Sequence, residues 1–178
     1  MNLDISNIGN QELLDYVSKN MENFNDFEVA ILFRSDYSQW SMIRNLITFL
    51  LENAWMDPVW KNRFSLIWDE LINNSIEYGS LPLDKNIFRI RLIQNEWSTD
   101  VILEVQDTWR WLMAKTSSQM EEIRQEKLEE WFDVFMGKRW RWLFKLVINI
   151  VDSLYFKDAE WGWLIVWIEK KLKPVQAD

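Results

Sequence analysis

Helix-like and strand-like segments follow one another along this chain with no evident linker or repeat between them, and this mixed order constrains the fold more than any other feature. Residues 27–33, 87–94 and 100–106 are rich in apolar and β-branched residues, which indicates strands. Residues 38–54 carry apolar side chains at helical spacing. Elements in this order bury their apolar faces most simply in layers. We therefore expect an α/β fold, a two-layer α/β sandwich in which helices cover one face of a mixed, mostly antiparallel sheet.

The other segments complete this prediction. The second and third strands are separated by a turn at Trp97 and form an antiparallel hairpin. A charged helix over residues 118–132 is expected to present a solvated face. An amphipathic helix follows from Leu143, and two strands, 154–157 and 163–171, close the chain. Residues 1–25 are polar with one short amphipathic helix, and we interpret them as an N-terminal extension for docking or for a homodimer.

Composition excludes several classes of function. The 178 residues include no cysteine and no histidine, which removes thiolate metal sites, disulfides and the commonest general base. A formal charge of −8 without a basic run argues against a nucleic-acid partner. The N-terminus has no basic segment followed by an apolar one, and the longest apolar run is far too short to span a membrane. We expect a cytoplasmic protein with no membrane segment.

Residues 64–80 form the stretch around which the rest of the chain is organised. Proline after Asp57 opens a helix here, and apolar residues at helical spacing line one stripe of it. Glu70 and Asn74, one turn apart, lie along the edge of that stripe. A carboxylate and an amide so close to a core indicate a functional site. The alternative is an ordinary amphipathic helix that ends at Gly79 in a left-handed cap, and spacing alone does not decide between the two.

Tryptophan and glycine contents are abnormal. The chain has 13 Trp and 4 Gly, whereas glycine usually supplies about 7% of a globular protein. Trp97 stands in a turn, and Trp55 stands at a predicted helix end, where glycine is favoured. Further tryptophans form W-x-W pairs in loop-like contexts. The tryptophans thus occupy positions that are typical of glycine.

Four motifs together resemble the GHKL ATPases, the superfamily of histidine-kinase catalytic domains, gyrase B, Hsp90 and MutL. Glu70-x-x-x-Asn74-x-x-x-Tyr78-Gly79 resembles the N-box, with tyrosine where histidine is frequent. The strand that ends in Asp107-Thr-Trp-Arg-Trp resembles the D-x-G-x-G loop, with Trp109 and Trp111 at the glycine positions. A second glycine box and its following helix are matched by Trp140, Trp142 and Leu143. The segment Trp-Gly-Trp at 161–163, with the strand after it, resembles the closing glycine turn. The flanks are most similar to stand-alone anti-sigma-factor serine/threonine kinases.

This resemblance implies a fold and a set of roles. It implies the Bergerat ATP-binding fold over residues 26–178, with an ATP lid at about 108–141. The residue matched by Glu70 is the general base, and the one matched by Asn74 holds Mg²⁺. Asp107 would accept a hydrogen bond from the adenine amino group, and Leu164 stands where a threonine is often found beside the adenine. Backbone N–H groups at positions 109, 111, 140, 142 and 143 would hold the ATP phosphates.

Tryptophan at the glycine positions has three explanations. Glycine is needed where φ is positive or where backbone touches phosphate, and a bulky residue in the left-handed region costs about 1–2 kcal/mol. The explanation we favour is a decoding mismatch: some bacterial lineages read UGA as glycine, and a translation table that reads UGA as tryptophan would convert those glycines. The alternatives are a true pseudo-ATPase, or aromatic anchors for carbohydrate or for an interface.

The sequence supports two functions. The first is an ATP-dependent protein serine/threonine kinase that acts on a regulatory protein partner, such as a sigma factor or an anti-anti-sigma-like protein. Since the chain has no histidine, it is not a self-phosphorylating histidine kinase, and the phosphoacceptor is expected on another protein. The second is a non-catalytic binding module that sequesters a regulator. Restored glycines favour the first, and the tryptophans as written favour the second.

Overall fold

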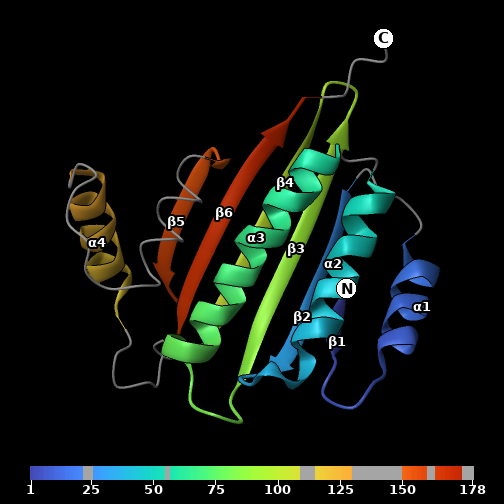
Figure 1. Ribbon diagram of the computed structural model, residues 1–178, viewed down its shortest axis with the longest axis horizontal. Helices are drawn as coiled ribbons and strands as arrows, with labels where there is room; N and C mark the ends of the chain where they lie inside the picture. The colour runs from blue at the N-terminus through green and yellow to red at the C-terminus, as the bar shows by residue number, and fades with distance from the viewer. Residues whose placement is uncertain (22–25, 55–56, 109–114, 130–149, 160–162, 174–178) are drawn as a thin grey trace.

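The protein folds as a two-layer α/β sandwich, which confirms the predicted fold class. The computed structural model describes residues 1–21, 26–54, 57–108, 115–129, 150–159 and 163–173. Three helices lie side by side over one face of a six-stranded sheet, and a fourth lies beside the sheet at its far edge (Figure 1). Within the described residues, no helix has the length and apolar character needed to cross a membrane.

The sheet is mixed and mostly antiparallel. Its strand order is β1-β2-β3-β4-β6-β5, and only the β1–β2 pairing is parallel. The strands are β1 (Asn2–Asp4), β2 (Asp26–Arg34), β3 (Lys85–Asn95), β4 (Ser98–Asp107), β5 (Ser153–Asp158) and β6 (Leu164–Leu172). The predicted hairpin is present as β3 and β4, and the two predicted closing strands are β5 and β6.

The helices that the structure describes lie where the sequence predicted helices, and residues 143–149 of the helix predicted from Leu143 lie outside the described residues. The described helices are α1 (Asn10–Asn20), α2 (Trp40–Asn53), preceded by the 3-10 turn η1 (Tyr37–Gln39), α3 (Pro58–Asn74), followed by the π-helical turn η2 (Ser75–Gly79), and α4 (Ser117–Glu129). The hydrophobic core lies between α1, α2 and α3 and the face of the sheet that they cover. α4 is not fully solvated, because Met120 is completely buried against this core.

The first 20 residues pack on the same core as the rest of the chain. β1 pairs with β2, and α1 buries Leu13 and Val17. Ile5, between the two elements, is also completely buried. The division of the chain at residue 26, and the docking or homodimer role of the segment before it, stay predictions.

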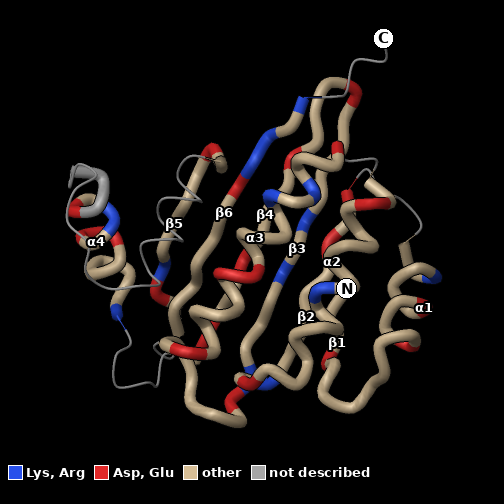
Figure 2. The backbone as a smooth tube through the Cα atoms, in the orientation of Figure 1, with Lys and Arg blue, Asp and Glu red and all other residues tan. Residues whose placement is uncertain are grey.

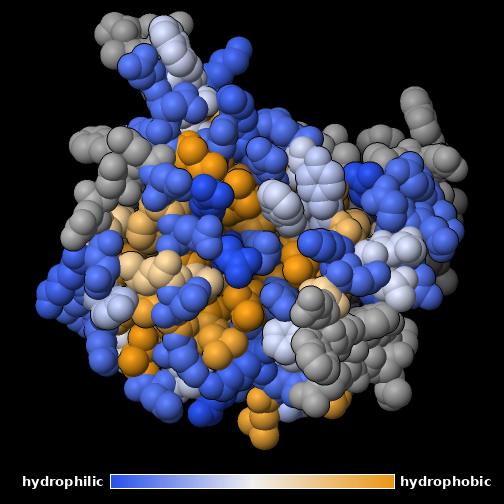
Figure 3. All heavy atoms as spheres, turned by 180° about the vertical axis from the view of Figure 1, so that it is seen from behind, coloured by the Kyte–Doolittle hydropathy of each residue, from blue (hydrophilic) through white to orange (hydrophobic). Residues whose placement is uncertain are grey.

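The opposite face of the sheet has no helix over it in the described part of the chain. Seen from behind, it shows apolar residues in the middle, with hydrophilic ones among and around them (Figure 3). Basic residues lie along β3 and in the last part of β6 (Figure 2). Arg89 pairs with Glu104 across the β3–β4 register and with Glu28 of β2 at 3.4 Å. The pair with Glu28 is largely exposed, with side chains 32% and 43% exposed, and exposed ion pairs contribute little to stability.

Two interpretations of backbone conformation are wrong: the alternative interpretation of Gly79 as a left-handed helix cap, and the interpretation of Trp97 as a residue in a glycine conformation. The φ of Gly79 lies outside the left-handed region, so this residue is not a left-handed helix cap. Leu83 is the only non-glycine residue with a positive φ among those described, so Trp97 does not adopt a glycine conformation either. The Asn95 side chain closes that turn, because its Oδ1 accepts the N–H groups of Trp97 and Ser98, both at 2.9 Å.

Candidate functional site at the end of α3

α3 carries the first two candidate residues in its second half. Pro58 is the first helical residue, and Asp57 before it is the N-cap. The Asp57 carboxylate accepts the N–H of Val59 at 2.7 Å. The buried stripe of α3 then fixes which way the helix faces: Phe64, Ile67, Trp68, Leu71 and Ile72. Glu70 is half-buried beside this stripe. Acidic residues are visible on the same part of the helix in Figure 2.

Asn74 is buried, and its side-chain amide has an unsatisfied hydrogen-bond donor. Its exposed fraction is 7%, and its Nδ2 has no hydrogen-bond partner among the described residues. An unsatisfied buried donor costs about 1–3 kcal/mol, and such a group in a folded protein requires an explanation. In the role that the sequence resemblance implies, Oδ1 of this amide would be a ligand of Mg²⁺ and Nδ2 would donate to a phosphate oxygen.

The residues after Asn74 form a π-helical turn, Ser75–Gly79, rather than a regular helix end. π-Helical turns are rare in proteins, and those that occur are often found at functional sites. A hydrogen bond of 2.7 Å from the Tyr37 hydroxyl to Oε1 of Glu77 joins the turn to η1. The turn ends at Gly79, which is buried.

Gly79 lies directly against the side chain of Asp107. A Cβ added to Gly79 would be 2.7 Å from the Cβ of Asp107 and still closer to its carboxylate. Asp107 is the last residue of β4, is 5% exposed and stands opposite Leu164 in the β4–β6 register. Glycine is therefore required here by close approach rather than by a positive φ. The contact brings the predicted N-box to the predicted adenine-binding aspartate.

Asp69 is an acidic residue beside this site that the sequence reasoning did not select. Burial raises its pKa from 3.8 to about 6, with a smaller increase from the charge of Glu70 and an opposing effect from Arg44 of α2. Its Oδ1 has no hydrogen-bond partner among the described residues. The available signal was two adjacent carboxylates on a partly apolar helix, of which the sequence reasoning used one.

The other predicted site residues lie outside the described residues: Trp109, Trp111, Trp140, Trp142 and Leu143. Of the predicted ATP lid, residue 108 and residues 115–129 are described, and α4 belongs to it. Among the described residues there is no group of three or more acidic side chains placed to hold a metal ion. A magnesium ion at Asn74 would therefore depend on phosphate and water for most of its ligands.

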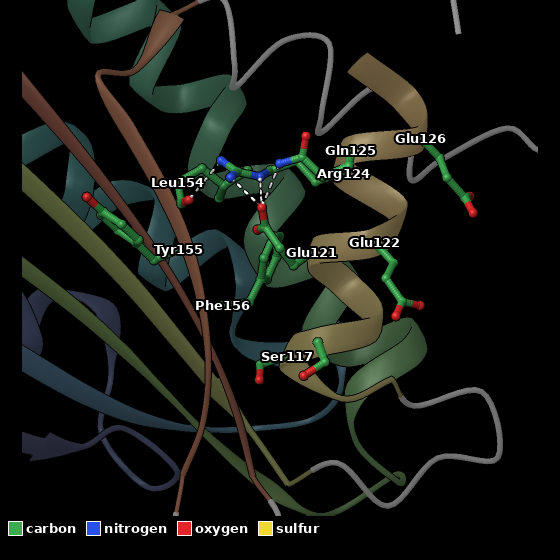
Figure 4. A pocket seen from close by; sticks show the side chains of 10 residues that line it. Ser117, Glu121, Glu122, Arg124, Gln125, Glu126, Leu154, Tyr155 and Phe156 are labelled. Atoms are coloured by element: carbon green, nitrogen blue, oxygen red, sulfur yellow. Dashed lines mark hydrogen bonds and ion pairs between the residues drawn. The ribbon is translucent and has the colours of Figure 1, made fainter. Parts of the chain in front are cut away.

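A separate groove of about 810 Å³ lies between α4 and β5 (Figure 4). Arg124 lies across it, donating to Oε1 of Glu121 at 2.5 Å and to the backbone oxygen of Leu154 at 3.3 Å. The Glu122 and Glu126 side chains point away from β5. Of the predicted site residues that the structure describes, Glu70, Asn74 and Asp107, none lines this groove.

Two described tryptophans lie in or against the core with unsatisfied indole groups. Trp68 is completely buried and Trp40 packs on it, with 5.7 Å between ring centroids. The Nε1 atoms of both have no hydrogen-bond partner among the described residues. Buried tryptophans usually place this N–H against an acceptor. The two indoles fill space here without the polar contact that normally accompanies them.

Comparisons with known proteins add no identification. No model of a protein family matches the sequence, and a search of curated proteins gives no significant match.

Proposed function

We propose that this chain is an ATP-binding, protein serine/threonine kinase-like regulator that acts in trans on a partner protein. The observation that carries the proposal is the contact between Gly79 and Asp107. It joins two motifs that are 28 residues apart, at the point where a GHKL nucleotide site needs them. The buried amide of Asn74, with its unpartnered Nδ2, supplies a polar group beside the same turn.

The chain's residues have separate roles in this proposal. Bound ATP with Mg²⁺ supplies the transferable phosphoryl group. Asn74 holds the cation end of the nucleotide and Asp107 accepts the adenine amino group, which fixes the orientation of the ligand. Glu70 takes the proton from a serine or threonine hydroxyl of the partner. Positioning and charge stabilisation then account for most of the rate, as in other phosphoryl transfers.

The partner is a regulatory protein, such as a sigma factor or an anti-anti-sigma-like protein. The absence of histidine supports an acceptor on another chain. The alternative function, a non-catalytic module that sequesters such a regulator, is favoured if Trp109, Trp111, Trp140 and Trp142 are native. Indoles at these positions would fill the space that the nucleotide needs.

Calorimetry with ATP and Mg²⁺ tests the proposal on two full-length chains. The literal chain keeps all tryptophans as they stand in the sequence. The four-glycine chain has Trp109, Trp111, Trp140 and Trp142 changed to glycine. We expect binding in the four-glycine chain and none in the literal one. Asp107→Asn in the four-glycine chain should abolish the preference for ATP over GTP. Failure of both chains to bind nucleotide would reject the proposed function in favour of the sequestering module.

The catalytic role of Glu70 has its own test. Glu70→Gln keeps the size of the side chain and removes the base, so nucleotide affinity should be unchanged. Phosphoryl transfer to a partner should fall by roughly 10²–10⁴-fold. Transfer at full rate in Glu70→Gln would show that another group is the base.

A further inference from the structure

A buried network of four polar side chains joins the elements that carry the candidate site. Its members come from the π-helical turn, the residue after it, β3 and the residue after β4: Ser75, Ser80, Asn86 and Thr108. Ser80 and Asn86 are completely inaccessible to solvent. The motifs described in the sequence assign no role to any of the four.

The hydrogen bonds of the network run in one direction. The Ser75 hydroxyl donates to the backbone oxygen of Ile72 at 2.9 Å and accepts from Nδ2 of Asn86 at 3.3 Å. The Ser80 hydroxyl donates to Oδ1 of Asn86 at 2.6 Å. It also accepts the backbone N–H of Thr108 at 2.9 Å. Each serine hydroxyl has one proton, and each proton is used once.

The network ends on a charged group at the surface of the fold. The Thr108 hydroxyl lies 2.6 Å from Oδ2 of Asp84 and 3.1 Å from the Ser80 hydroxyl. Its single proton belongs to the shorter, charge-assisted bond to the carboxylate. The network therefore runs from the last turn of α3, through β3, to the end of β4, with a hydrogen bond at every step.

Each member except Asn86 directly follows a residue of the candidate site in the chain. Ser75 follows Asn74, Ser80 follows Gly79, and Thr108 follows Asp107. Because the hydrogen bonds hold these three residues in place, they also hold the backbone of the residue before each of them. Apolar side chains of the same shape would stabilise this region about as well, whereas a fully satisfied polar network specifies one arrangement.

We propose that Ser75, Ser80 and Asn86 are positioning residues that set the separation between Asn74 and Asp107, the two ends of the nucleotide pocket. The ligand-binding part of this inference rests on the proposed function. A nucleotide that contacts both ends requires the correct separation. A ligand that contacts the Asp107 end alone, such as adenosine, does not.

The test uses Ser80→Ala and Ser75→Ala in whichever full-length chain, literal or four-glycine, binds ATP with Mg²⁺. Ser98→Ala is the matched control, because Ser98 is also buried and bonds an asparagine, Asn95, at the other end of β4. We expect ATP affinity to fall roughly tenfold in both test variants, as for other residues that orient a ligand-binding group. Adenosine affinity should not change, and the control should keep both affinities.

Hydrogen exchange without nucleotide is the second measurement. Amides of residues 75–80 should exchange faster in both test variants and at the normal rate in Ser98→Ala. Equal losses of ATP and adenosine affinity, or no loss of either, would overturn the positioning role. If neither chain binds a nucleotide, the proposed function fails, and the exchange experiment alone tests the positioning role. Unchanged exchange at residues 75–80 would then overturn this role. Faster exchange at these residues would support it. Should Ser80→Ala fail to fold, Ser75→Ala carries the test.

Discussion

The backbone of Gly79 contacts the side chain of Asp107 so closely that no Cβ fits between them. The two residues lie on different layers of the fold, one at the end of the π-helical turn and the other at the end of β4. Their contact fixes how the helix of Glu70 and Asn74 meets the sheet. It is the structural basis for regarding these motifs as one site.

Gly79→Ala should therefore damage both stability and binding. The added methyl group would meet the Cβ of Asp107 as well as its carboxylate, so rotation of the carboxylate alone does not relieve the clash. We expect a loss of about 1–3 kcal/mol in the free energy of unfolding, together with loss of ATP binding. Denaturant titration and calorimetry measure the two effects.

Gly9→Ala is the control for this substitution. A Cβ at Gly9 meets nothing within 4 Å. The expected loss is less than about 1 kcal/mol, because Gly9 is a helix N-cap without a side-chain bond. Equal losses in the two variants would contradict the close contact at Gly79.

Asp69→Asn should make stability less dependent on pH. The pKa of Asp69 is raised to about 6 by burial, so the folded protein holds a proton that the unfolded chain releases above pH 3.8. Asp69 thus favours folding below pH 4, and this contribution is lost as pH rises to 6 and beyond. A shift of this size corresponds to about 3 kcal/mol when fully expressed, and solvent screening at a half-buried group reduces it to about 1 kcal/mol.

The measurement is urea unfolding of both proteins at a series of pH values. We expect Asp69→Asn to be more stable than the unchanged protein at pH 7 and to lose this advantage at pH 4. Glu122→Gln, at an exposed position on α4, serves as the charge-matched control. An unchanged pH profile in Asp69→Asn would show that this carboxyl is solvated in the folded protein.

The coding DNA should contain TGA, which is UGA in the messenger RNA, at the tryptophan positions. The unsatisfied indole groups of Trp40 and Trp68 are consistent with glycine at these positions in the native protein. Sequencing decides the question, because UGG at positions 109, 111, 140 and 142 would reject the decoding mismatch.

A stability measurement gives an independent answer. A chain with glycine at all 13 positions should unfold cooperatively if glycine is native. If the indoles are native, removing the Trp68 side chain alone should cost about 3–5 kcal/mol, since it is completely buried in the core. Loss of cooperative unfolding in the 13-glycine chain would show that the tryptophans belong to the fold.

Asp158→Ala should loosen α4. The carboxylate of Asp158 in β5 accepts the N–H of Ser117 at 2.8 Å and its hydroxyl at 2.7 Å, at the first turn of α4. Loss of such a cap costs about 1 kcal/mol, and α4 should exchange its amide hydrogens faster. Asp152→Ala, before the other end of β5, is the control, because Asp152 bonds Lys170 and Lys171 instead. Equal exchange of α4 in the two variants would show that Ser117 does not depend on Asp158.

Local patterns predicted the elements well because each carried its own signal. The β3–β4 hairpin followed from two β-branched runs and a short turn, and α3 followed from Pro58 and a stripe at helical spacing. The position of the turn at Trp97 was predicted correctly, but a glycine conformation for Trp97 was not. The Asn95 side chain closes this turn instead, by accepting the N–H groups of Trp97 and Ser98.

The site was only partly predictable. Glu70, Asn74 and Asp107 were selected from spacing and from resemblance to a family. Asp69 was not, because its pKa depends on burial against α2, which no local pattern encodes. Ser80 and Asn86 were missed for the same reason, since ordinary polar residues gain significance only from their partners.

The sequence by itself determined the succession of helices and strands, because hydrophobic periodicity and turn residues act over a few neighbouring positions. Only the tertiary structure decided that Gly79 is needed for contact with Asp107 rather than for a left-handed cap. The two residues are distant in the chain, and their proximity depends on how α3 packs on the sheet. Long-range packing, rather than local conformation, makes this turn part of a candidate site.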